Sequence, residues 1–114
     1  DIEAAVAKGD ERAIITEKIF TNRIVETVGS YYMQMGGCDA IVFTAGVGEN
    51  SKDTRQAIMN ALEPTLGTIC DDAANDVRAK ETLLTTADAK TKVYLIPTNE
   101  EVVIARDTYE LTEK

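Results

Sequence analysis

A strand-like segment that runs into a Gly-x-Gly turn is the part of the sequence best suited to chemistry. Residues 40–43 read Ala-Ile-Val-Phe, a continuous apolar run, and Gly46 and Gly48 follow. Because neither glycine has a Cβ, the main chain of such a turn can approach a ligand closely. Asn50 or Ser51 can cap the helix expected next, whose first N–H groups favour an anion. The pattern predicts a ligand-binding turn; a tight strand-to-helix connection that binds nothing is the alternative.

The glycine spacing does not match two well-known phosphate-binding motifs. The third glycine of a dinucleotide fingerprint is missing, and so is the Gly-Lys-Ser/Thr sequence of a P-loop. A Rossmann-type oxidoreductase would also need an acidic residue on the following strand, and none is present in clear form. The residues of the turn alone therefore leave its ligand open.

Two neighbouring carboxylates, Glu100 and Glu101, are the second candidate for chemistry. Residues 98–101 read Thr-Asn-Glu-Glu, which predicts a capping box with Thr98 as N-cap and Glu101 at the third helical position. Glu100 has no such duty and directly follows the end of an expected strand. It is suited to hold Mg²⁺, directly or through water, because Mg²⁺ usually takes one or two protein carboxylates together with phosphates. Stabilisation of both carboxylates by the helix dipole alone is the alternative.

Other polar side chains are not assigned to a site. Arg23 and Arg55 are expected at the surface or in ion pairs, and Arg106 is expected to pair with a carboxylate. Cys38 and Cys70 are expected to be buried or half-buried thiols, because they form no CxxC motif.

The composition narrows the class of protein. A net charge of -8 disfavours nucleic acid and anionic membranes as partners. The sequence has no histidine, which excludes His-based zinc sites and catalytic triads. Two cysteines without a disulfide pattern favour reduced thiols in the cytoplasm. No apolar run is long enough for a membrane span.

The elements that must position these residues alternate between helix and strand. This order predicts one α/β domain with a parallel or mixed sheet. Helices are expected at residues 1–8, 10–35, 52–62, 71–80 and 98–111, and strands at residues 40–43, 82–86 and 93–96. The strand at 40–43 should be buried on both faces.

Apolar periodicity predicts which helix faces are covered. The long helix carries one stripe at 3.6 residues per turn, formed by Ala13, Phe20, Ile24, Val28, Tyr31 and Met35. Ile15 and Ile19 lie near its opposite side, which indicates a second, partner-binding surface. In the last helix, residues 102–105 are apolar nearly all round, so we expect that end to be buried.

The two candidate segments together resemble acetate kinases. Residues 39–51 (Asp-Ala-Ile-Val-Phe-Thr-Ala-Gly-Val-Gly-Glu-Asn-Ser) and 96–101 (Ile-Pro-Thr-Asn-Glu-Glu) carry the resemblance, which continues through residues 103–108. Residues 1–3 and the long helix are similar too, so the resemblance covers essentially the whole chain.

The resemblance implies a fold and a set of roles. It implies a mixed sheet flanked by helices, belonging to the C-terminal actin-like (RNase H-like) ATPase domain of a two-domain kinase. It implies that residues 1–114 are the C-terminal portion of the second domain, with the N-terminal domain absent. It implies that the glycine turn contacts the nucleotide through Gly46, Val47, Gly48, Glu49 and Asn50, and that Glu100 belongs to a Mg²⁺ site.

The resemblance also implies an activity. Acetate kinases transfer a phosphoryl group reversibly between ATP and acetate, and they form cytoplasmic homodimers through this domain, in agreement with Ile15 and Ile19. The family's catalytic arginines, histidine and aspartate lie outside this chain, so no catalytic residue is assigned and the isolated chain should be inactive. A propionate kinase fragment, a non-catalytic small-molecule-binding domain and a dimerisation domain are the alternatives.

Overall fold

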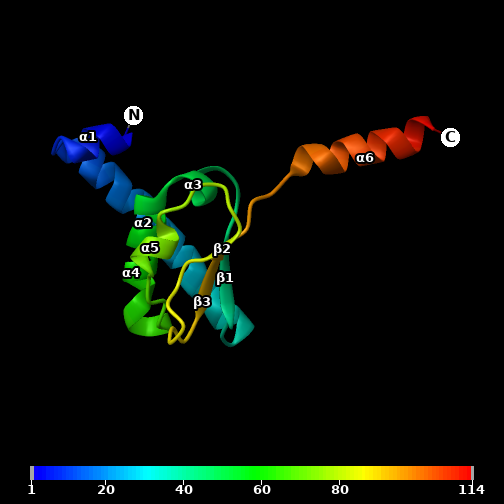
Figure 1. Cartoon of the computed structure of the whole chain (residues 1–114). Coiled ribbons are helices and arrows are strands. Elements are labelled where there is room, and N and C mark those ends of the chain that lie inside the picture. Colours follow the sequence, from blue (N-terminus) through cyan, green and yellow to red (C-terminus); the bar gives the residue numbers. More distant parts are fainter. Residues whose placement is uncertain (1, 114) are drawn as a thin grey trace.

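The computed structural model describes residues 2–113 and contains a three-stranded sheet with helices packed on one side (Figure 1). The helices are α1 (Ile2–Ala7), α2 (Glu11–Met35), α3 (Ala45–Asn50), α4 (Lys52–Leu66), α5 (Asp72–Asn75) and α6 (Glu100–Thr112). The strands are β1 (Ala40–Phe43), β2 (Thr82–Leu83) and β3 (Lys92–Leu95). The alternation expected from the sequence is confirmed.

The sheet is mixed, in the order β1-β3-β2. Strand β1 runs parallel to β3, and β2 runs antiparallel to it. Strand β2 is shorter than predicted, and beyond it a single bridge joins Thr85 to Cys70. Parallel β1 and β3 are joined by a crossover that includes α4, as parallel neighbours require.

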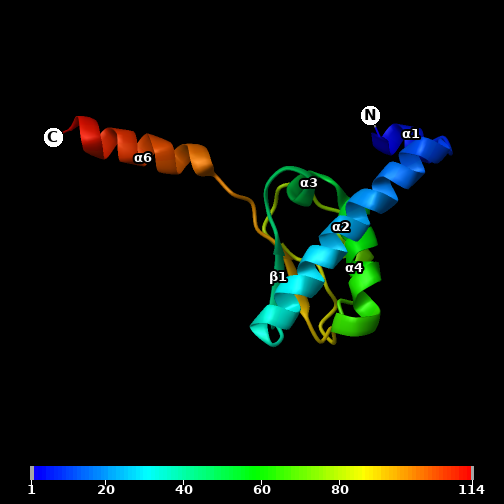
Figure 2. The same ribbon diagram turned by 180° about the vertical axis from the view of Figure 1, so that it is seen from behind.

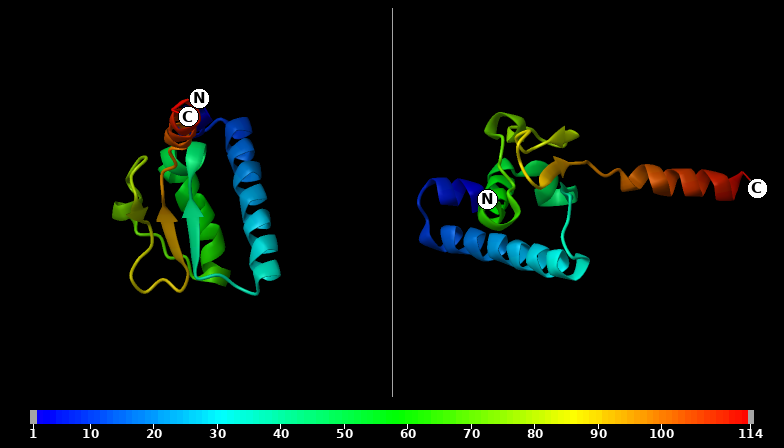
Figure 3. Two further views of the ribbon diagram at one scale, coloured as in Figure 1. Left: turned by 90° about the vertical axis from the view of Figure 1, so that its right-hand side faces the viewer. Right: turned by 90° about the horizontal axis from the view of Figure 1, so that it is seen from below.

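The core lies between the sheet and α4, with α2 on the outer side of α4 (Figure 3). Met59 of α4 is fully buried and packs with sheet residues Leu84, Val93 and Leu95. The α2–α4 contact buries Ile58, Leu62 and Leu66 against Ile24, Val25, Val28 and Tyr32. Figure 2 shows α2 running diagonally across the molecule in front of α4 and the strands. Removal of these apolar surfaces from water supplies the main driving force for this layering.

The sheet face opposite α4 is open. Tyr94 lies between Val42 and Leu83 in the strand register, and Val42 and Leu83 are 48% and 37% exposed. The expectation that β1 is buried on both faces is wrong, because the described residues supply a helix layer on only one side of it. Strand β1 is also an edge strand, with β3 as its single neighbour among residues 2–113.

Helix α2 has the predicted length, and its predicted apolar stripe is covered only in part, at residues such as Ala13, Ile24 and Val28. Asp10 caps its start by accepting the N–H of Ala13 at 2.9 Å, and Gly36 ends it in the left-handed conformation. Tyr31 and Met35 are 61% and 69% exposed, so their place in the predicted stripe is wrong. Tyr32 packs against α4 instead, because the helix turns its face gradually along 25 residues.

Helices α4 and α5 differ in length from the prediction. Helix α4 passes through Pro64 and ends at Gly67, and the added turn buries Leu66. Gly67 has φ 68°, and a Cβ there would lie 2.8 Å from the Cβ of Lys90, so this stop requires glycine. Helix α5 has four residues rather than ten.

Helix α6 projects from the body of the molecule (Figure 1). None of its residues is buried, and Val103 and Ile104 are 55% and 66% exposed, so the predicted burial is wrong for this chain. The N-cap is Asn99, whose Oδ1 accepts the N–H of Val102 at 3.2 Å, and not Thr98. In the described part of the chain, no helix is both long enough and apolar enough to cross a membrane.

Candidate functional site

The glycine turn forms the short, kinked helix α3 directly after β1. Gly46 has φ 34° and ψ -118°, which breaks the helix at its second residue. Ala45 also has a positive φ of 54°. A left-handed conformation favours glycine, so the kink explains the glycine at position 46. A Cβ built at Gly46 would meet no atom within 4 Å, which shows that this face of the turn is open to a ligand.

Glu49 holds the start of the turn and connects it to the chain before α6. Its Oε1 accepts the N–H of Ala45 at 2.7 Å and the N–H of Thr98 at 2.9 Å. These two main-chain N–H groups, that of Thr98 first, hold the pKa of Glu49 below its ordinary value. Oε1 of Glu49 is therefore engaged by the protein itself.

Asn50 closes the turn from its other end. Its Nδ2 donates to the carbonyl of Gly46 at 2.7 Å, and its Oδ1 accepts from Nε of Arg78 at 2.9 Å. Arg78 belongs to the irregular segment after α5, whose residue Ala79 donates its N–H to the carbonyl of Glu49 at 3.0 Å. Arg78 gave no signal in the sequence, because only tertiary structure brings it to the turn.

Arg55 braces the turn from its buried side. The side chain is fully buried, and its NH1 group donates to the carbonyls of Gly48 and Glu49 at 3.0 and 3.2 Å. The expectation of a surface or ion-pairing Arg55 is wrong. Its position offered a signal, because Arg55 precedes Ile58, Met59 and Leu62 at helical spacing and so falls on the buried stripe of α4.

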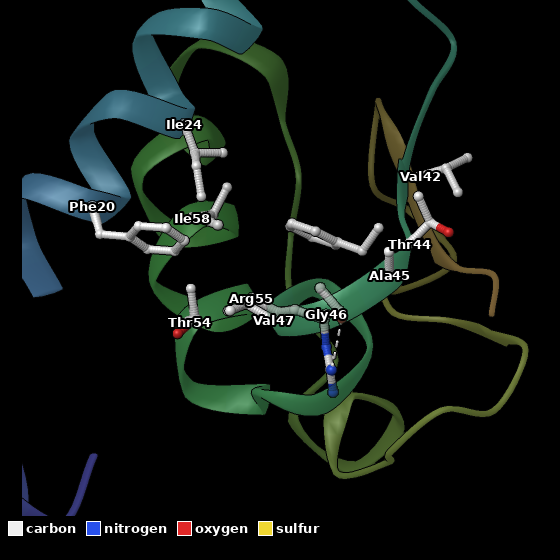
Figure 4. A pocket seen from close by; sticks show the side chains of 12 residues that line it. Phe20, Ile24, Val42, Thr44, Ala45, Gly46, Val47, Thr54, Arg55 and Ile58 are labelled. Carbon is white, nitrogen blue, oxygen red and sulfur yellow. Dashed lines mark hydrogen bonds between the residues drawn. The ribbon is translucent and has the colours of Figure 1, made fainter. Parts of the chain in front are cut away.

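Two hollows open beside the turn and share its residues. One, with a volume of 440 Å³, lies between α2, the end of β1 and α4, and Figure 4 shows its lining side chains. The other, of 710 Å³, extends toward α1 and Arg78. Both are lined by Phe20, Gly46, Val47 and Thr54. The arrangement offers an apolar and aromatic wall next to exposed main chain, which suits a planar, partly polar ligand.

Glu100 and Glu101 occupy the first turn of α6 and are exposed. The bond from Thr98 to Glu49 brings the chain before α6 to the glycine turn, so the two candidate segments meet. The predicted capping box does not form, because Asn99 takes the capping position from Thr98.

The fit of Glu100 to a magnesium ion depends on its free oxygens. Among residues 2–113, the Glu100 carboxylate has neither a hydrogen-bond nor an ion-pair partner, and no three acidic, Cys or His groups gather to form a cage. One available carboxylate fits the way Mg²⁺ is held beside phosphates, mainly by phosphate oxygens and water. It does not fit a Mg²⁺ site built from protein alone.

The remaining polar residues stay outside the site. Arg23 approaches Glu26 at 4.0 Å on the exposed face of α2. Arg106 forms no ion pair within the described part of the chain. Cys38 and Cys70 are half-buried free thiols, and burial raises the pKa of Cys70 to about 11, which keeps it protonated and unreactive.

Comparison with known proteins agrees with the resemblance carried by the two segments. The acetokinase family model matches residues 1–106. The acetate kinase of Alkaliphilus metalliredigens is 50% identical over 111 residues, which are 97% of this chain and 28% of that protein. The crystal structure of Porphyromonas gingivalis acetate kinase superposes with a TM-score of 0.83 at 38% identity, over 97% of this chain and 28% of that chain.

A propionate kinase is also similar. The crystal structure from Francisella tularensis superposes with a TM-score of 0.80 at 35% identity, over 91% of this chain and 26% of that chain. The fold is thus that of these kinases, which have the actin-like ATPase architecture expected from the sequence. The chain spans about 28% of the length of the curated relatives it matches. With nearly all of its residues matched by one family model, the chain belongs to the acetokinase family.

Proposed function

We propose that this chain forms one wall of the nucleotide site of a kinase that transfers a phosphoryl group between ATP and acetate. Membership of the acetokinase family and the names of the relatives support this activity. The observation that carries the proposal is the 2.9 Å bond from Thr98 to Glu49, because it brings the glycine turn and the start of α6 together. A turn beyond the carboxyl end of a strand is where open α/β sheets bind their ligands.

The adenosine part of the nucleotide lies against the open face of the turn. Gly46 and Val47 border both hollows, and the exposed ring of Phe20 faces them from α2. Gly48 lies against β1, and a Cβ there would make an ordinary contact with the Cβ of Phe43 at 3.5 Å. Asn50 and Glu49 keep the shape of the turn through their bonds to its main chain.

Glu100 is the residue of this chain that contributes to the magnesium site. Its carboxylate is exposed and has no partner among residues 2–113, and it lies on the first turn of α6, two residues after the Thr98 that binds the turn. Bound Mg²⁺ would offset the charge of the nucleotide phosphates during transfer. The partial positive charge at the N-terminal end of α6 also favours a phosphate group near Glu100.

The chain supplies binding residues and no catalytic ones. Phosphoryl transfer depends on positioning and on cations that meet the transferred group. We assign those groups to other parts of the full-length kinase, with this chain as the C-terminal portion of its second domain. The isolated 114-residue chain is then inactive. Propionate is the alternative acceptor, favoured by the similarity to the Francisella tularensis propionate kinase.

A homodimer interface on α2 is part of the proposal. Ile15 and Ile19 are 56% and 59% exposed on a helix whose other side packs on α4. Replacing both by glutamate should convert a dimer to a monomer in sedimentation experiments, because two charges cannot be buried there unpaired. An unchanged sedimentation profile would exclude this surface. Unpaired Cys38 and Cys70 support a cytoplasmic location.

Calorimetry with MgADP tests the nucleotide site. We expect the full-length protein to bind one MgADP, and the isolated chain to bind weakly or undetectably because the facing wall is missing. Glu100→Ala in the full-length protein should weaken MgADP binding roughly tenfold, as loss of a metal-supporting group does. Binding of metal-free ADP should stay unchanged.

Glu101→Ala is the matched control, since Glu101 is the next carboxylate on the same exposed helical turn. It should leave MgADP affinity at the wild-type value. Equal losses in the two variants would remove the magnesium role of Glu100. Absence of nucleotide binding by the full-length protein would remove the proposed function.

A further inference from the structure

Arg55 is a buried cation without a buried anion. The side chain is fully buried, and no carboxylate in residues 2–113 lies within ion-pair distance of it. Burial lowers its pKa, although a guanidinium stays charged at neutral pH. An apolar side chain of similar size is usually the less costly choice at such a position. The packing of α4 alone therefore does not account for an arginine.

All five N–H donors of Arg55 are used, and the acceptors lie at the C-terminal end of α3 and at the end of α5 and just beyond it. Toward the glycine turn, the guanidinium meets the carbonyls of Gly48 and Glu49 at 3.0 and 3.2 Å. Toward the segment after α5, it meets the carbonyls of Asn75 and Val77, both at 2.8 Å, and the Asn75 Oδ1 at 2.9 Å. The carbonyls bound on the two sides of the guanidinium are 26 to 29 residues apart in the sequence. The planar guanidinium therefore joins two distant segments rigidly.

The glycine turn needs such a support. Helix α3 has six residues, none of them buried, and a kink at Gly46. A single helical turn of this kind is not stable by itself. The carbonyls that Arg55 binds lie at the C-terminal end of α3, where a positive charge also offsets the helix dipole.

We infer that Arg55 is a positioning residue for the nucleotide: from the buried side, it fixes the turn whose opposite face contacts adenosine. The inference rests on the proposed function and extends it to a residue whose five guanidinium N–H groups all bond to the protein itself. Arg55 joins the turn to residues 75–77, so that this second segment becomes part of the same rigid wall. Loss of the fork should leave the turn present but loosely held, which weakens nucleotide binding selectively.

Arg55→Lys and Arg55→Met separate the fork from the charge and from the packing. Lysine keeps the charge and has no planar fork, whereas methionine keeps apolar bulk and has no donors. In the full-length protein, we expect both variants to raise KM for ATP about tenfold or more, with KM for acetate unchanged. Arg23→Lys, on the exposed face of α2, is the matched control and should leave both KM values unchanged.

Amide hydrogen exchange on this chain provides a readout that needs no nucleotide. Both Arg55 variants should speed exchange at Ser51 and Ala79, whose N–H groups donate to Val47 and Glu49, while α2 keeps its protection. Asn75→Ala, which removes one acceptor, should act in the same direction and more weakly. This milder variant keeps the test valid if Arg55→Met does not fold.

Two outcomes would overturn the inference. One is a variant with unchanged KM for ATP and unchanged exchange at the turn. The other is an equal rise in KM for ATP and acetate with faster exchange throughout α2 and α4, which describes a general packing defect. If the wild-type protein binds no nucleotide, the proposed function fails, and the exchange data still decide whether Arg55 holds the turn.

Discussion

Helices α4 and α6 are similar in length and capping but opposite in their surroundings. Helix α4 has 15 residues, six of them buried, and α6 has 13 residues with none buried. Each starts with a side-chain N-cap, Ser51 in α4 and Asn99 in α6. The difference therefore does not come from local helix signals. It comes from the layers that this chain does or does not bring to each helix.

The two helices mark a part of the molecule whose apolar side chains are covered and a part whose apolar side chains are exposed. Around α4, the sheet and α2 cover the apolar side chains on both sides. Around α6, Ile104, Tyr109 and Leu111 are 66%, 65% and 74% exposed. An isolated helix of this length is marginally stable in water. We expect other parts of the full-length protein to cover α6.

The largest expected effect comes from truncating a side chain in each helix. Met59→Ala in α4 should lower the free energy of unfolding by about 2–5 kcal/mol, because the fully buried side chain leaves a cavity among sheet residues. Ile104→Ala in α6 should leave the unfolding free energy nearly unchanged. Urea titration of the isolated chain measures both. Similar losses would mean that α6 folds back onto the body.

A smaller effect is expected from removing the two caps. Ser51→Ala removes an acceptor for the N–H of Thr54 and should lower the global unfolding free energy by about 1 kcal/mol. Asn99→Ala should speed amide exchange within α6 only, because its unfolding is not coupled to the core. Urea titration and hydrogen exchange together distinguish the two responses. A loss of global unfolding free energy in Asn99→Ala would show that the unfolding of α6 is coupled to the core.

The smallest expected effect concerns the hydrogen bond from the N–H of Thr98 to Glu49. This bond links the covered part of the molecule to the segment before α6. The pKa of Glu49 is lowered in the folded chain, chiefly by the N–H of Thr98 and then by that of Ala45. The contribution of the Glu49 carboxylate to the stability of the folded chain is therefore fully present above the ordinary pKa of a glutamate. It is lost as the pH falls through the lower pKa of the folded chain.

An NMR pH titration follows this link directly. The Thr98 amide proton should shift upfield as Glu49 is protonated, with a midpoint below that of a glutamate in an unstructured peptide. Glu49→Gln is the control, since its amide oxygen accepts a hydrogen bond but does not titrate. A midpoint at or above the peptide value would show that the bond does not form in solution.

Local signals in the sequence predicted the elements better than their surroundings. Strand residues 40–43 and the capped start of α4 at Ser51 were predictable, because a β-branched apolar run and an N-cap act over a few residues. The spacing of Arg55 from Ile58 and Leu62 indicated its burial, but its hydrogen-bond partners were not predictable, since only the fold brings the carbonyls of residues 75 and 77 near it. The exposure of α6 was missed for the converse reason: its apolar residues reflect layers that this chain lacks.

In the candidate site too, the sequence predicted local features better than contacts between distant segments. The resemblance to acetate kinases implied nucleotide and metal roles for Gly46 and Glu100, and the bond from Thr98 to Glu49 joins their segments. The sequence did not point to Arg78, because a surface arginine on an irregular segment carries no periodic signal. Nor could it show that the Glu49 carboxylate would be occupied by main-chain N–H groups of its own chain.

The bare edge of β1 has a consequence for any work with the isolated chain. A strand with unpaired N–H and C=O groups and an apolar face is a template for a strand of another molecule. At high concentration the chain should therefore stack through intermolecular β-pairing into aggregates that bind amyloid dyes. Such stacking would survive glutamates on α2, so a lysine at Val42 is needed before sedimentation reports on the helical interface alone.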